Sequence, residues 1–437
     1  MNLEPPSRRY FAVQYSPKIE SYSMIRCLNR AQPVTILALA VALVVTPVVF
    51  AQSGSKSPSP AKSQQQQKAN SKMKGGSADI RAEAGATSTS PLSFPFKRVW
   101  QYLTDSASTL PPTVAGARIY LPLSGGRVLC LDRDTGTLLW SSDPGGVISA
   151  PIEVAGNSVF IATNRVADDG SEAGGSLRAV DSTTGLTVWV KDYQRPFTSS
   201  VVARADRLYA GSADGAFYAL SSKTGDVVWK IETQDVVHGS ALVTDRAIYF
   251  GGDDGALRAI APEPGSLIWK FQTGGKIIGQ PSIDDRAVYF GAGDGYVYSI
   301  EPHTGKLRWR SRTGAAVEAS PVIVGDRILV ASFDNFIYAL ARSTGDRLWK
   351  RRLENRLSSA PIVNGDASLV APLRGDYVAV FLNSDGRRVN LYQLDKDFEI
   401  VADPVFSEST LVLATNKGLV VAIASRAKDN PTNAVKK

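Results

Sequence analysis

The chain has 437 residues, 43% hydrophobic and 21% charged, a composition typical of a globular protein. Its net charge of +8 comes from the N-terminal part, because residues 1–96 carry 11 Lys/Arg against 4 Asp/Glu, a balance of +7. The other 38 basic and 37 acidic residues balance to +1, so we expect no nucleic-acid-binding face there. The whole chain has two His and two Cys, and Cys27 lies in the predicted leader, so the remaining residues are too few for a zinc site of the usual His/Cys ligand count.

Residues 1–51 are predicted to be an export leader. Two Arg precede a continuous apolar run of 18 residues, 34–51, which ends in small residues before a polar stretch. This order predicts a secretory signal cleaved before Gln52, and hence a periplasmic or secreted product. An uncleaved membrane anchor is the alternative, because 18 residues are just enough to span a bilayer. Met24 is an alternative start of the chain, because it begins a signal of ordinary length.

Residues 52–92 are rich in Ser, Gln, Lys, Gly and Pro and contain few large apolar side chains. Such a segment buries too little apolar surface to offset the entropy of ordering the chain. We therefore predict a disordered linker at 52–95, a folded domain at 96–424 and a disordered tail at 425–437.

A short pattern, Thr-Gly with Trp four residues after the Gly, recurs through the predicted domain. Successive Trp residues lie 40, 49, 40, 40, 40 and 40 residues apart, and a period of this size indicates a repeat architecture. The seven Trp of the chain all belong to this series: Trp100, Trp140, Trp189, Trp229, Trp269, Trp309 and Trp349. All but the first follow the Gly of such a turn, with Pro264 once in place of Thr: Gly136, Gly185, Gly225, Gly265, Gly305 and Gly345.

Each repeat is predicted to form four short strands. The first strand ends in small residues and often Pro, as at Pro281, and the second is rich in β-formers, as in 247–250. The third follows an Asp-Gly turn, a strong hairpin signal, and the fourth follows Thr-Gly and carries Trp. Four-stranded antiparallel units of this length are typical of propeller blades, so the fold class is all-β and the architecture a β-propeller.

The blades can be counted from their third strands. Eight third strands are predicted, and the last, 420–423, has no fourth strand after it. Trp100 lies in a fourth strand that has no third strand before it. We therefore predict an eight-bladed propeller in which residues 96–103 complete the blade formed by residues 401–424.

A column of small residues accompanies the Trp series. In each third strand one position is small, which leaves room for a neighbouring indole: Cys130, Ala179, Ala219, Ala259, Ser299, Ala339, Ala379 and Ala422. Since Cys130 occupies the position of an Ala, we expect a packed thiol rather than a reactive one.

The segments from Ala219 to Trp229 and from Ala339 to Trp349 share the pattern Ala, four residues, Thr-Gly, three residues, Trp. This pattern resembles the pyrroloquinoline-quinone (PQQ)-type propeller repeat over residues 96–424. Two classes of protein share that repeat. Quinoprotein alcohol dehydrogenases bind PQQ and calcium over the channel, whereas envelope proteins resembling the BamB component of the outer-membrane β-barrel assembly machinery bind other proteins.

The resemblance to the dehydrogenases implies an adjacent Cys-Cys disulfide and a Glu/Asn/Asp set for calcium and catalysis. This chain has no Cys-Cys pair and is shorter than those enzymes. BamB-like proteins match better in length, blade count and export signal, although the lipid-attachment Cys after the signal is missing here. We therefore predict a monomeric, non-catalytic scaffold that binds envelope proteins such as a β-barrel assembly complex, without metal or cofactor. A PQQ-dependent oxidoreductase or PQQ-binding protein, with PQQ and calcium, is the alternative.

Residues that break the repeat are better candidates for function than residues that keep it. In the predicted topology, the loops from fourth to first strands and from second to third strands share one face. The candidates for ligand or partner contact on this face are His238, Gln280, Glu318, Arg374 and Asp403. Polar residues that merely line a water-filled channel are the competing interpretation. Turn residues such as Asp254 are expected to form hairpins.

Overall fold

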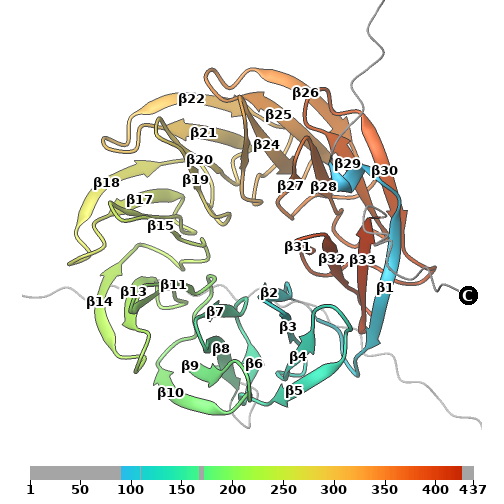
Figure 1. Ribbon diagram of the computed structural model, residues 1–437. Helices are drawn as coiled ribbons and strands as arrows, with labels where there is room; N and C mark the ends of the chain where they lie inside the picture. Colours follow the sequence, from blue (N-terminus) through green and yellow to red (C-terminus); the bar gives the residue numbers. More distant parts are fainter. Residues whose placement is uncertain (1–89, 109, 167–171, 426–437) are drawn as a thin grey trace, which may run out of the picture. The chain divides into compact units, whose positions relative to one another are not determined.

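A computed structural model of the chain describes residues 90–108, 110–166 and 172–425. The strands form eight antiparallel sheets that follow one another around a ring (Figure 1). The described residues contain one 3-10 helix, η1 (Pro91–Ser93), and no α-helix. The predicted all-β class and eight-bladed propeller are thus confirmed. The predicted leader, the linker up to residue 89 and the tail from residue 426 lie outside the described residues.

In blades 1 to 7 the strand numbers rise from the innermost to the outermost position of the ring, and in blade 8 the outermost strand is β1 (Figure 1). Blades 1 and 2 contain β2 (Thr113–Ala115), β3 (Arg118–Pro122), β4 (Val128–Asp132), β5 (Leu138–Ser142), β6 (Val147–Ile148), β7 (Glu153–Ala155), β8 (Ser158–Val166), β9 (Glu172–Asp181) and β10 (Thr187–Tyr193). Blades 3 and 4 contain β11 (Val202–Arg204), β12 (Arg207–Gly211), β13 (Ala216–Ser221), β14 (Val227–Glu232), β15 (Leu242–Val243), β16 (Ile248–Phe250), β17 (Ala256–Ile260) and β18 (Leu267–Gln272).

The second half of the ring keeps the same order. Blades 5 and 6 contain β19 (Ser282–Ile283), β20 (Val288–Gly291), β21 (Tyr296–Ile300), β22 (Leu307–Arg312), β23 (Val322–Val324), β24 (Arg327–Ser332), β25 (Phe336–Ala341) and β26 (Arg347–Arg352). Blades 7 and 8 contain β27 (Ile362–Asn364), β28 (Ala367–Val370), β29 (Tyr377–Leu382), β30 (Arg388–Gln393), β31 (Val405–Ser407), β32 (Thr410–Ala414), β33 (Leu419–Ser425) and β1 (Phe96–Leu103).

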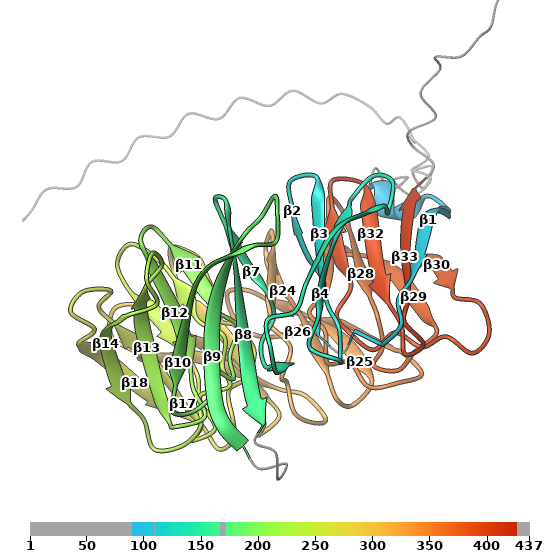
Figure 2. The same cartoon turned by 90° about the horizontal axis from the view of Figure 1, so that it is seen from below.

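Two blades depart from the simple pattern of four consecutive strands. In blade 8 the outermost strand is β1, which pairs with β33 so that Phe96 lies opposite Ser425 and Leu103 opposite Leu419. This pairing of the two ends of the domain confirms the predicted closure. In blade 2 the innermost position is divided between β6 and β7, which pair with different ends of β8. Figure 2 shows β8 and β9, the longest strands, from the side.

The first strand of a blade begins after the recurring Pro, so the prediction that it ends there was wrong. Pro281 and Pro321 each stand one residue before their strands, β19 and β23. The small residues before Pro belong to loops where neighbouring blades come close. A Cβ on Gly279 would lie 2.7 Å from the carbonyl oxygen of Glu318 in the next loop. Small side chains therefore permit this contact, and Pro, which has no N–H to donate, fits just ahead of the strand.

Seven of the eight interfaces between blades are built in the same way, and we call them indole interfaces. The Trp of one blade packs on the Gly turn of the next, and its Nε1–H donates to a carbonyl oxygen of that turn. The seven N–O distances are 2.7–3.2 Å, to Arg133, Ser182, Ser222, Pro262, Pro302, Arg342 and Asn383. The Trp series is therefore structural, as the fold prediction required.

Gly345 shows why these turns need glycine. Its φ is +79°, a conformation that side chains with a Cβ rarely adopt, and an added Cβ would lie 2.5 Å from Cε3 of Trp309. Both the turn geometry and the space for the indole thus require a residue without a side chain.

The small residue of each third strand is the cross-strand partner of the Trp in the same blade. Cys130 lies opposite Trp140, and Ala339 lies opposite Trp349. In blade 7 the predicted member, Ala379, lies one position away from the column, because Val380 is the residue opposite Asn390, where the other blades carry Trp. With no indole to accommodate in this blade, the position holds a β-branched side chain.

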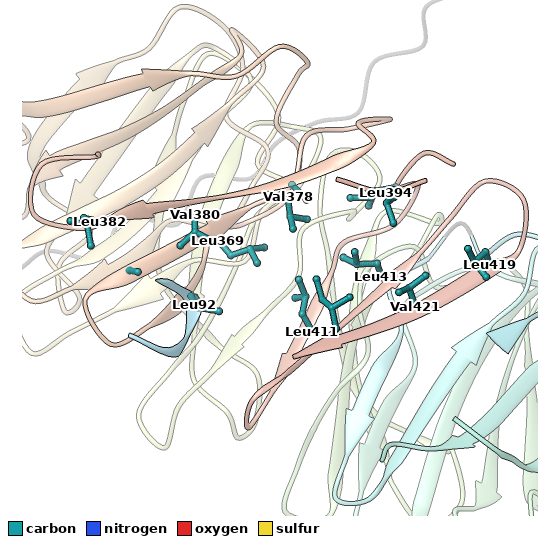
Figure 3. Close-up of a cluster of buried hydrophobic side chains, with 14 residues drawn as sticks. Leu92, Leu369, Val378, Val380, Leu382, Leu394, Leu411, Leu413, Leu419 and Val421 are labelled. Carbon is teal, nitrogen blue, oxygen red and sulfur yellow. The ribbon is translucent and has the colours of Figure 1, made fainter. Parts of the chain in front are cut away.

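The interface between blades 7 and 8 has no indole and is filled from the N-terminal side of the domain. Leu92 of η1 is completely buried in a cluster that includes Leu369, Val380 and Leu411 (Figure 3). Asn390 Nδ2 donates to the carbonyl oxygens of Leu92 (2.9 Å) and Phe94 (2.6 Å). Residues of the segment 90–95, which the sequence placed in the predicted linker 52–95, therefore pack against blades 7 and 8.

Candidate functional site

The loops from fourth to first strands and the turns from second to third strands lie on one face, which we call the loop face. In seven blades the preceding loop is joined to the turn by a backbone hydrogen bond. The Asp253 N–H donates to the Val236 carbonyl (2.9 Å), and the Gly293 N–H donates to that of Lys276 (2.8 Å). All five predicted candidates belong to loops and turns of this kind or directly follow them.

One candidate, His238, contacts Asp253 on the loop face, and a second candidate, Glu318, interacts with Asp253 through charge. His238 Nδ1 lies 2.9 Å from Oδ1 of Asp253, and Lys276 Nζ is bonded to Oδ2 of the same carboxylate. The Asp253 side chain is 5% exposed, whereas those of His238 and Lys276 are 42% and 58% exposed. A buried acid thus orients two accessible basic side chains. We call His238, Asp253, Lys276 and Glu318 the Asp253 cluster.

The charges of this cluster influence one another. The hydrogen bond to Asp253, followed by the charge of that carboxylate, raises the pKa of Lys276, so its ammonium form is stabilised. Burial raises the pKa of Glu318, while the positive charge of Lys276 lowers it and the negative charge of Asp253 raises it. Glu318 is therefore electrostatically part of the cluster, although no hydrogen bond joins it to the other three.

The sequence contained a signal for Asp253, which was not among the predicted candidates. The same backbone hydrogen bond defines the equivalent turn position in seven blades: Ser124, Ala213, Asp253, Gly293, Phe333, Leu373 and Asn416. Asp253 is the one acidic residue among these seven, but the sequence pattern pointed to its neighbour Asp254 as a hairpin former. Asp254 indeed caps the turn, since its carboxylate accepts from the Ala256 N–H at 3.0 Å. Comparing the repeats position by position would have identified Asp253.

The other three candidates lie apart from this cluster. Gln280 Nε2 donates to the Ala241 carbonyl at 2.6 Å and so connects two neighbouring loops. Arg374 has φ of +53° in the turn between β28 and β29, and its N–H donates to the Ile400 carbonyl at 3.2 Å. Its backbone helps to shape that turn, and its side chain is exposed.

Asp403 lies in a cavity of about 220 Å³ where blades 7, 8, 1 and 2 approach one another. It accepts a hydrogen bond of 2.5 Å from the Ser359 hydroxyl. The surrounding protein raises the pKa of Asp403 by restricting its solvation, and the Ser359 hydroxyl partly opposes this effect. Asp403 as a whole residue is nevertheless exposed.

The cavity beside Asp403 can be tested for calcium, which prefers six to eight oxygen ligands. Its lining holds a single carboxylate together with Pro111, Pro151 and Pro372. Across the part of the chain that the structure describes, no three His, Cys, Asp or Glu side chains gather in a group that could hold a metal ion. The residues at this cavity therefore do not fit a calcium-bound quinone.

Cys130 is completely buried in the core between blades 1 and 2. Burial raises the pKa of its thiol to about 11, so the thiolate is a minor species at neutral pH. The packed environment agrees with its place in the column of small residues. Residues 90–425, apart from the short gaps named above, include no helix long and apolar enough to cross a bilayer.

The repeat, the blade topology and the indole interfaces define an eight-bladed β-propeller of the PQQ-repeat class. Within that class, the chain belongs to the family described as outer membrane protein assembly factor BamB, whose model matches residues 97–174, 173–278 and 253–436. No curated protein matches the chain in sequence.

Three solved structures are similar to the propeller, and they include a BamB protein and a quinohemoprotein alcohol dehydrogenase. BamB from Moraxella catarrhalis has a TM-score of 0.64 at 19% identity, covering 76% of this chain and 98% of that chain. The computationally designed Ika8 protein has a TM-score of 0.64 at 15% identity, covering 77% and 99%. Quinohemoprotein alcohol dehydrogenase from Comamonas testosteroni has a TM-score of 0.61 at 11% identity, covering 77% of each chain. At these identities the likeness concerns the fold alone.

Proposed function

We propose that the chain is a non-catalytic protein-interaction scaffold of the cell envelope, acting with a β-barrel assembly complex. Its family is described as an outer membrane assembly factor, and the sequence predicts an export signal ahead of the propeller. The rigid ring suits such a role, because loops held by a rigid scaffold are common sites of recognition. The product is proposed to be periplasmic, or membrane-anchored if the leader stays uncleaved.

The observation that carries this proposal is the Asp253 cluster. His238 and Lys276 project from two different loops, yet both are fixed by one buried carboxylate. Long polar side chains that are already oriented lose less conformational entropy on binding, so they contribute more to affinity. The cluster therefore presents a preformed, partly basic contact for an acidic or hydrogen-bond-accepting surface of a partner protein.

A pull-down from envelope extracts tests the contact directly. Tagged wild-type protein is expected to retain a specific partner that the double variant His238→Ala/Lys276→Glu loses. Lys270→Glu is the matched control, because Lys270 is an exposed Lys on the outer strand β18, and it should retain the partner. Equal recovery by all three proteins would count against the loop face as the partner-binding surface.

The alternative, a PQQ-dependent oxidoreductase, predicts a different result. Purified protein reconstituted with PQQ and calcium would then show quinone absorbance and dye-linked alcohol oxidation. We expect neither, because the cavity near Asp403 offers one carboxylate and the sequence has no Cys-Cys pair. Turnover in this assay would overturn the scaffold proposal.

A further inference from the structure

A second candidate site lies on the outer side of the ring, between blades 6 and 7. A cavity of about 780 Å³ is lined by the end of β26 and by one face of β29 and β30. It is separate from the Asp253 cluster, whose residues belong to the loops around blades 4 and 5. We call it the blade 6–7 pocket.

The pocket exists because a large side chain is missing from blade 7. In blades 3, 5 and 6 the third strand carries Tyr218, Tyr298 and Tyr338 directly before the small-residue column. Their hydroxyls donate to Asp214, Asp294 and Asp334 of the preceding turns. Tyr338 lies opposite Val330, and the equivalent position opposite Val370 is Ala379. An Ala in place of a Tyr leaves the volume of a phenol ring unfilled beside Phe381.

The lining combines apolar and basic groups. Phe381 and Tyr377 are buried at the base, while Leu391 is exposed. The Arg351 guanidinium is held by the carbonyl oxygens of Gly386 (2.8 Å) and Asp385 (2.5 Å). The pocket thus has a buried apolar base next to a positive charge whose position is fixed by hydrogen bonds.

Two further arginines at the pocket remain available for a ligand. The guanidinium groups of Arg352 and Arg388 make no hydrogen bond or ion pair within the described residues, and both side chains are exposed. Glu354 and Asp376 also line the pocket. An anionic group of a ligand is therefore favoured only where it lies closer to the arginines than to these two carboxylates.

The surface around the pocket is strongly basic. The outer strands β22 and β26 contain no acidic residue and carry seven basic ones: Arg308, Arg310, Arg312, Arg347, Lys350, Arg351 and Arg352. The outer strand β5 of blade 1 has none, and the outer strand β18 of blade 4 has a single Lys. A local field of this sign attracts anionic groups to blades 5 to 7.

We propose that the blade 6–7 pocket binds an acidic segment of a partner protein through an aromatic side chain. The ring occupies the volume that Tyr338 and its equivalents fill in other blades, against Phe381 and Leu391. Carboxylates on either side of the ring pair with Arg352 and Arg388. An aromatic ring in an apolar pocket flanked by charge-assisted hydrogen bonds is a strong anchor for a short segment.

Fluorescence polarisation with defined peptides tests this proposal. The probe is fluorescein-labelled Glu-Asp-Tyr-Asp-Glu, with Gln-Asn-Tyr-Asn-Gln and Glu-Asp-Ala-Asp-Glu as matched controls. Full-length protein is expected to bind the probe saturably and both controls at least about tenfold more weakly, since each control removes one of the two recognised features.

Variants of the pocket separate its two parts. Ala379→Tyr fills the hollow with the residue found in blades 3, 5 and 6, and is expected to weaken probe binding by about tenfold or more without lowering the thermal midpoint. Arg352→Gln/Arg388→Gln changes exposed side chains only and should weaken binding to a similar extent. Lys270→Gln, on the outer strand of blade 4, should bind as wild type. If Ala379→Tyr fails to fold, the arginine pair alone decides the outcome.

Two results would overturn the proposal. One is probe binding that is unchanged in both pocket variants. The other is no saturable probe binding, together with cosedimentation of the protein with phosphatidylglycerol vesicles that depends on the arginines but is unaffected by Ala379→Tyr. That second pattern would identify the basic outer strands as a membrane contact.

Discussion

The indole interfaces and the interface between blades 7 and 8 hold the same kind of sheet together by different means. In an indole interface such as that of blades 5 and 6, Trp309 is buried against Gly345 and donates to the Arg342 carbonyl at 3.0 Å. All parts come from two consecutive repeats. Between blades 7 and 8, Asn390 occupies the position of the Trp and the apolar filling is Leu92. That filling is separated from Asn390 by 298 residues of sequence.

This difference shows how the ring is closed. Residues 90–103 contact three consecutive blades, because Leu92 fills the interface of blades 7 and 8, β1 completes blade 8, and Trp100 packs on the Gly136 turn of blade 1. One indole interface can form as soon as two repeats are present, whereas the last interface requires both ends of the domain. We infer that the segment 90–95 closes the propeller at the point where the repeat lacks its Trp.

Trp309→Ala should have the largest effect on stability of the changes considered. It removes a nearly fully buried indole and its hydrogen bond and leaves a cavity beside Gly345, which typically costs about 3–5 kcal/mol. Chemical denaturation followed by circular dichroism measures the loss. Trp309→Phe should fall between the variant and wild type. An unchanged midpoint in Trp309→Ala would mean that the indole does not stabilise the interface.

Leu92→Ala tests whether Leu92 stabilises the interface between blades 7 and 8 as the Trp side chains stabilise the indole interfaces. Leu92 is completely buried, so the change should cost about 2–4 kcal/mol. Leu103→Ala is the matched control on the neighbouring strand, because Leu103 is 70% exposed and its loss should be nearly neutral. Equal midpoints for the two variants would show that η1 is dispensable for the closed ring.

The indole interfaces could be predicted from the sequence, whereas the interface between blades 7 and 8 could not. The period of 40 residues and the unpaired strands at both ends predicted eight blades and the closure by β1, because each repeat carries its own turn and Trp signals. Leu92 could not be predicted, since a single apolar side chain in a polar segment has no period and its partners are distant in sequence. Ala379 was assigned to the column because its side chain is small, although Val380 is the residue that lies opposite Asn390 and stands at the same distance before Gly386 as Ala339 does before Gly345.

The candidate site residues could be predicted only in part, because the repeat pattern does not show what each side chain contacts. His238 and Glu318 were found as breaks in the loop pattern; His238 is hydrogen-bonded to Asp253, and Glu318 is influenced by the charges of Asp253 and Lys276. Gln280 also broke the pattern, yet it serves a backbone contact. A break in the repeat shows that a position differs from its equivalents. Only the structure shows whether the side chain there is presented on the surface, as for His238, or bonds a neighbouring loop, as for Gln280.

Asn390→Ala examines the polar half of the eighth interface. The amide donates to the carbonyls of Leu92 and Phe94, and losing these two hydrogen bonds, of which that to Leu92 is partly buried, should cost about 1–2 kcal/mol. Because both residues hold the same segment, Asn390→Ala and Leu92→Ala should be non-additive in a double-mutant cycle. Additive losses would indicate that the amide acts independently of the Leu92 packing.

Cys130→Ala should have the smallest effect, and it probes an indole interface from the side of the small residue. Ala occupies the equivalent position in several blades, so the loss at pH 7 should be about 1 kcal/mol or less. Burial raises the thiol pKa to about 11, above its value near 8.5 in an unfolded chain. The wild-type protein should therefore lose stability relative to Cys130→Ala as the pH rises from about 8.5 towards 11, because the unfolded state ionises first. Denaturation at pH 7 and pH 10 measures both effects, and parallel pH profiles would show that the thiol is not held in its neutral form by the packing against Trp140.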